Sequence, residues 1–125
     1  MKLTEEWLWK AQRDYDAAVL LMSGKYFDST VFHTQQCAEK ALKGYLSMQN
    51  QAIIKTHDLD LLLEKCKIFD STFGQLEYFT SALNNFDTLF RYPSSSLEPE
   101  ESEAQEAILC SEKILVFVIK KCNKS

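Results

Sequence analysis

Six polar residues stand where the helical pattern of this sequence expects apolar side chains, or where a helix begins or ends. They combine carboxylates, an amide, cations and an imidazole: Asp14, Gln35, Glu39, Lys43, His57 and Arg91. Polar groups that are withdrawn from water need hydrogen-bond partners. The set could therefore cross-link helices. It could equally line a cleft in which an arginine, a lysine and a histidine bind a phosphate or an RNA backbone.

The spacing of these residues predicts particular pairs. Glu39 and Lys43 are four residues apart, which is typical of an ordinary ion pair on a helix surface. Asp87 and Arg91 have the same spacing and could also pair. We predict a structural network in which Gln35 and Glu39 are partners of Asp14 and of the turn at His57.

Familiar catalytic and metal-binding templates are absent from the sequence. It has no Gly-rich phosphate loop, no G-x-S-x-G and no H-E-x-x-H. Two histidines are too few to build a metal site without several carboxylates, so we expect neither metal nor cofactor. The four cysteines are far apart and form no C-x-x-C pair: Cys37, Cys66, Cys110 and Cys122. We interpret them as buried, reduced thiols rather than disulfides.

Apolar residues repeat at helical spacing in five stretches that must position the polar set. We predict a first helix capped by Thr4 and ended by Gly24, and a second, capped by Asp28 or Ser29, that runs to about Met48. A short third helix follows Thr56-His57-Asp58, with Leu59, Leu62, Leu63 and Cys66 on one face. After a break at residues 71–74, a fourth helix ends at Arg91-Tyr92-Pro93, and the last spans about Ser102 to Cys122.

The predicted fold is therefore all-α, a single domain over residues 1–125 that forms an up-and-down bundle of four long helices and a short one. A polar linker, residues 94–101, precedes the last helix. That helix is apolar almost all round, which predicts burial on a second side, most simply in a two-fold dimer. With a net charge of −4, a general electrostatic attraction to nucleic acid is not expected, and any RNA or nucleotide contact would need a local pocket.

No apolar run approaches the length needed to cross a bilayer, and the first residues show no signal-peptide pattern. We therefore expect a cytoplasmic protein with no membrane contact.

Four motifs, in order along nearly the whole chain, resemble the HEPN domain family. They are Ala11-x-x-Asp14-Tyr15-x-x-Ala18, Gln35-Gln36-Cys37-Ala38-Glu39-Lys40-Ala41-Leu42-Lys43, Lys55-Thr56-His57-Asp58-Leu59 and Arg91-Tyr92-Pro93. The resemblance implies an up-and-down helical bundle that dimerises. Small prokaryotic members of this kind often accompany a minimal nucleotidyltransferase, and several such pairs behave as toxin and antitoxin.

Many members of the superfamily are metal-independent ribonucleases, in which a histidine follows an arginine after four to six residues. Arg91 matches that arginine by its place after the fourth helix. The positions expected for the histidine hold Ser96, Leu97 and Glu98. Since positioned proton transfer contributes about 10²–10⁴-fold to rate, the resemblance implies little or no ribonuclease activity here.

Three functional hypotheses follow. The preferred one is a non-catalytic, dimeric HEPN-type module that partners a nucleotidyltransferase and binds nucleotide or RNA through Arg91, Tyr92, Lys43 and His57. The alternative is a ribonuclease toxin that uses Arg91 with His57 as its catalytic pair. In the third, the polar set is only structural, within an interaction scaffold.

Overall fold

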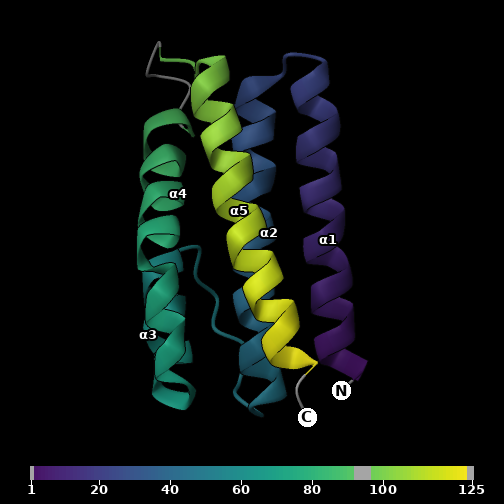
Figure 1. The fold of residues 1–125 in the computed structure, drawn as a ribbon, viewed down its shortest axis with the longest axis vertical. Coiled ribbons are helices and arrows are strands. Elements are labelled where there is room, and N and C mark those ends of the chain that lie inside the picture. Colours follow the sequence, from purple (N-terminus) through teal and green to yellow (C-terminus); the bar gives the residue numbers. More distant parts are fainter. Residues whose placement is uncertain (1, 92–96, 124–125) are drawn as a thin grey trace.

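The structure of this chain is a computed structural model that describes residues 2–91 and 97–123, and these residues form helices and no β-strand (Figure 1). In order, the elements are α1 (Lys2–Ser23), α2 (Phe27–Met48), α3 (Leu59–Phe69), the 3₁₀ helix η1 (Ser71–Leu76), α4 (Glu77–Phe90) and α5 (Glu101–Cys122). The predicted all-α bundle is confirmed. Within the described residues, no helix is both long and apolar enough to cross a membrane.

Helix α2 is the centre of the bundle. Figure 1 shows α5 in front of it, with α1 and α4 on either side, and α2 contacts all four other α-helices. Because it is surrounded, α2 buries polar residues as well as apolar ones; Gln35, Glu39 and Lys43 are all buried. Helix α1 comes close to α2 at Gly44, where an added Cβ would lie 3.0 Å from the Cβ of Trp7.

The first two helices end where predicted, before Gly24 and at Met48, but they start earlier than predicted. Helix α1 begins at Lys2, so Thr4 is a buried residue of the first turn and not the N-cap. Helix α2 begins at Phe27, before Asp28 and Ser29 could cap it. The reason lies in the connecting turn. Lys25 adopts the left-handed conformation (φ 63°), and the N–H of the next residue donates to the Leu21 carbonyl at 3.0 Å, which reverses the chain within three residues.

The third helix matches its prediction. The Asp58 side chain caps it by accepting from the N–H groups of Asp60 and Leu61, and the four residues of its predicted apolar face are all buried. The expected break after α3 is instead the ordered helix η1, which buries Phe73 between Tyr45 and Phe117, with ring centroids 4.4 Å and 5.0 Å away.

Helix α5 begins one residue earlier than predicted, and Glu101 belongs to it rather than to the linker. The N–H of Glu100 donates to the Glu103 carboxylate at 2.9 Å, which stabilises this end. Of the remaining linker, residues 97–100 are non-helical, and 94–96 lie outside the described residues. Most apolar residues of α5 pack inside the chain, while Leu109 and Val116 remain about half exposed. The dimer therefore stays a prediction.

Candidate functional site

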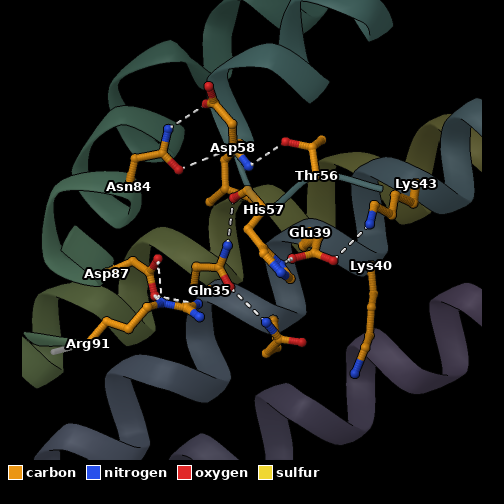
Figure 2. Close-up of polar contacts among 12 residues, drawn as sticks. Gln35, Glu39, Lys40, Lys43, Thr56, His57, Asp58, Asn84, Asp87 and Arg91 are labelled. Atoms are coloured by element: carbon orange, nitrogen blue, oxygen red, sulfur yellow. Dashed lines mark hydrogen bonds and ion pairs between the residues drawn. The ribbon is translucent and has the colours of Figure 1, made fainter. Parts of the chain in front are cut away.

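The turn at His57 is fastened to the middle of α2 by the predicted polar residues (Figure 2). The Gln35 side-chain amide donates to the His57 carbonyl at 2.9 Å, and the His57 Nδ1 lies 2.8 Å from the Glu39 carboxylate. Lys43 donates to the other Glu39 oxygen at 2.9 Å. We call Gln35, Glu39, Lys43 and His57 the loop anchor, because they hold the segment between α2 and α3 against the bundle.

The prediction that Glu39 and Lys43 form an ordinary ion pair on the helix surface is wrong. Their side chains are only 8% and 9% exposed, whereas the His57 side chain is 65% exposed. The packing of other helices around α2 removes the pair from water. A buried pair of this kind depends on complete hydrogen bonding, which His57 and Lys43 together supply to Glu39.

Asn84 on α4 completes the attachment of this turn, although no sequence pattern singles it out. Its side-chain amide donates to the Asp58 carboxylate at 3.0 Å, and its oxygen accepts from the Leu59 N–H at 3.0 Å (Figure 2). The start of α3 is thereby joined to α4 as well as to α2.

Asp14 does not join the loop anchor. Its carboxylate lies 2.8 Å from the His33 Nδ1 and accepts from Lys40 at 2.6 Å. The prediction that Gln35 and Glu39 are its partners is therefore wrong, because they lie on a different face of α2. His33 and Lys40 are two turns apart on α2 and face α1 together, a spacing that could have identified them as partners of a carboxylate on α1.

Arg91 lines a hollow of about 320 Å³ between the beginning of α2 and the end of α4. Asp87 holds its guanidinium through contacts of 2.9–3.1 Å, which confirms the predicted pair. The guanidinium carbon lies 6.0 Å from the centre of the Phe32 ring. Three phenylalanines, two aspartates and a histidine are among the other lining residues: Asp28, Ser29, Val31, Phe32, His33, Phe86, Asp87 and Phe90. We call this space the Arg91 hollow.

The four predicted ligand-binding residues are not brought together in one place. His57 lines a second hollow, which shares only Asp87 with the Arg91 hollow. Lys43 is held by Glu39 in the loop anchor, and Tyr92 lies outside the described residues. The residue that does accompany Arg91 is His33, one of the two histidines judged too few for a metal site and given no binding role by the sequence.

The thiols match their prediction, since all four cysteines are free and buried. Burial raises the pKa of the Cys66 and Cys110 thiols to about 12 and that of Cys122 to about 11, and it raises the pKa of Cys37 as well. Such thiols are poor nucleophiles. Residues 2–91 and 97–123 contain no group of three or more histidine, cysteine, aspartate or glutamate side chains that could hold a metal ion.

Comparison with protein families gives a match to the HEPN domain model over residues 4–122, almost the whole chain. This chain belongs to the HEPN domain family. Two solved structures agree. ST0689, described as an archaeal HEPN homologue, has a TM-score of 0.71 and 28% identity over 97% of this chain and 98% of that one. TT1696 from Thermus thermophilus has a TM-score of 0.81 and 26% identity over 97% and 99%. No curated protein matches.

The HEPN assignment confirms the resemblance found in the sequence and gives the fold a family.

Proposed function

We propose that this chain is a non-catalytic HEPN-type binding module that holds the phosphate of a nucleotide or of RNA in the Arg91 hollow. The observation that carries the proposal is the placing of an arginine beside aromatic walls in one open space. Arginine is suited to bidentate phosphate recognition, and aromatic rings can stack on bases. Asp87 holds the guanidinium on the wall of this space, which reduces the freedom that the arginine would lose on binding.

Binding of a labelled RNA hexanucleotide and of ATP, measured by fluorescence anisotropy and calorimetry, tests the proposal. We expect Arg91→Ala to weaken binding at least tenfold, since a charge-assisted contact of this type contributes about 1.5–3 kcal/mol. Lys10→Ala removes the same charge from an exposed position on α1 and serves as the matched control. Equal affinities of the Arg91→Ala variant and the wild type would contradict the proposal, as would the absence of binding by the wild type.

The alternative function, a metal-independent ribonuclease that uses Arg91 with His57, receives less support from the geometry. The two residues line separate hollows, and the His57 Nδ1 is engaged by Glu39. We expect RNA to remain intact when it is incubated with the purified protein and a chelator. Cleavage that is lost in both Arg91→Ala and His57→Ala variants would favour the ribonuclease instead.

We also propose that the module acts as a homodimer with a nucleotidyltransferase partner, in the manner of a toxin–antitoxin pair. The support is the resemblance to small HEPN proteins that accompany a minimal nucleotidyltransferase, together with the exposed Leu109 and Val116 on α5. Light scattering of the purified chain should give twice the monomer mass. Co-expression with the product of a neighbouring nucleotidyltransferase gene should give a complex. A stable monomer that binds no such product would contradict this part of the proposal.

A further inference from the structure

His33 projects into the Arg91 hollow from α2 and is held by α1. Its Nδ1 contacts the Asp14 carboxylate, and its side chain is 31% exposed. A carboxylate beside Nδ1 keeps a proton on that nitrogen, so the opposite nitrogen, Nε2, is the one left for a ligand. The edge contact with Phe32, at 5.3 Å between ring centroids, further restricts how the imidazole can turn.

The orientation of His33 also depends on Lys40, which holds Asp14 from the other side. Lys40 donates to the other oxygen of Asp14 at 2.6 Å, so the carboxylate is fixed from both sides. Its negative charge is also offset by a lysine that does not line the Arg91 hollow. The arrangement resembles the support given to a metal-bound or catalytic histidine, where an outer carboxylate selects the tautomer and sets the ring plane.

The charges around the Arg91 hollow make the protonation of His33 important. Asp28 on α2 and Asp87 on α4 oppose the single positive charge of Arg91, while Asp14 and Lys40 offset each other behind the imidazole. With neutral His33 the lining groups therefore carry excess negative charge, and with protonated His33 they balance. An anion should enter more readily in the second case, because the excess negative charge is cancelled and an N–H donor is added at Nε2.

We propose that His33 is the second ligand-binding residue of the Arg91 hollow, where its protonated imidazole donates through Nε2 to the phosphate that Arg91 holds. Asp14 and Lys40 are positioning residues for it. This inference rests on the proposed function, since it assigns a further contact to the same phosphate. The probe is a phosphodiester, because a phosphomonoester changes its own charge at about pH 6 and would obscure the contribution of His33.

The test uses a fluorescent RNA hexanucleotide with 2′-O-methyl riboses, whose phosphodiesters keep their charge across the range studied. Wild-type protein should bind it about tenfold more tightly at about pH 5.5 than at about pH 8. At both pH values, the His33→Gln variant should bind with the affinity that the wild type has at about pH 8. Arg91→Ala should bind more weakly at both values and keep the pH dependence, which separates the two contacts.

NMR titration of the wild-type imidazole gives a second readout that needs no substitution. Saturating RNA should shift the Nε2 resonance of His33, because that nitrogen donates to the bound phosphate. Absence of RNA binding at either pH would overturn both this inference and the proposed function. If Arg91→Ala weakens RNA binding but His33→Gln keeps the pH dependence, only the proposed role of His33 is overturned. An Nε2 resonance that RNA leaves unchanged would overturn that role too.

Discussion

Two carboxylates on neighbouring helices have nearly the same partners and different tasks. Glu39 lies between His57 at 2.8 Å and Lys43 at 2.9 Å, and Asp14 lies between His33 at 2.8 Å and Lys40 at 2.6 Å. In the loop anchor Lys43 is buried, whereas the His57 imidazole is largely exposed to solvent. In the other group the lysine and the imidazole are both partly exposed, and the imidazole faces the Arg91 hollow.

The difference shows that the surroundings of a pair, more than its composition, decide what it does. A lysine that is 9% exposed is poorly solvated when its carboxylate is removed, so loss of Glu39 alone should strongly destabilise the fold. Lys40 and His33 are 25% and 31% exposed and can turn to water. Their carboxylate is therefore open to a role in binding. Substitutions in each group test this contrast, from the largest expected effect to the smallest.

Glu39→Ala should destabilise the protein most. It leaves the Lys43 ammonium buried without a counter-charge and releases His57, and loss of one member of a buried pair costs about 3–5 kcal/mol. Urea unfolding followed by circular dichroism measures the change in the free energy of unfolding. The double variant Glu39→Leu with Lys43→Met should recover most of the loss, because it leaves no charge behind. A loss below about 1 kcal/mol for Glu39→Ala would remove the distinction between the two groups.

Asp14→Ala should cost about 1–2 kcal/mol, clearly less than Glu39→Ala, because the released Lys40 and His33 side chains can both reach solvent. The same urea experiment measures it. Asp14→Asn, which keeps the shape and one acceptor oxygen, serves as the control and should lie between the variant and the wild type. If Asp14→Ala proves as costly as Glu39→Ala, the Asp14 group is a structural anchor too.

The sequence predicted elements whose pattern is local. The face formed by Leu59, Leu62, Leu63 and Cys66, the cap at Asp58 and the pair of Asp87 with Arg91 all depend on residues within one or two turns of a helix. The start of α2 was missed because the turn before it depends on a left-handed lysine, and lysine carries no bias toward that conformation.

The candidate site was harder to predict because it is made by contacts between distant segments. The network was expected as one group, yet Asp14 faces His33 and Lys40, while Gln35 and Glu39 face the turn at His57. A pattern in one helix shows that a polar residue faces inward and not which neighbour it meets. The pairing of Asn84 with Asp58 spans 26 residues and has no local signature. For the same reason, the sequence predicted His57 beside Arg91 and did not predict His33 there.

A third carboxylate, Asp70, extends the comparison to a more exposed acidic side chain. It accepts from Lys121 on α5 at 2.8 Å and from Thr72, and these contacts lower its pKa from 3.8 to about 2. Both partners of the ion pair are about a quarter to a fifth exposed, so solvent weakens it. Asp70→Asn should therefore cost only about 0.5–1 kcal/mol near neutral pH.

The pH dependence of the Asp70→Asn effect distinguishes the charge from the cap that Asp70 provides for η1. Because the folded pKa lies below the ordinary value, the ion pair stabilises the folded state above about pH 4, and this contribution disappears as the pH falls toward 2. The difference in unfolding free energy between wild type and Asp70→Asn should shrink over that window. Lys121→Met should show the same narrowing, since it removes the other half of the pair. A difference that stays constant down to about pH 2 would show that the ion pair does not cause it, because protonation of Asp70 removes that pair.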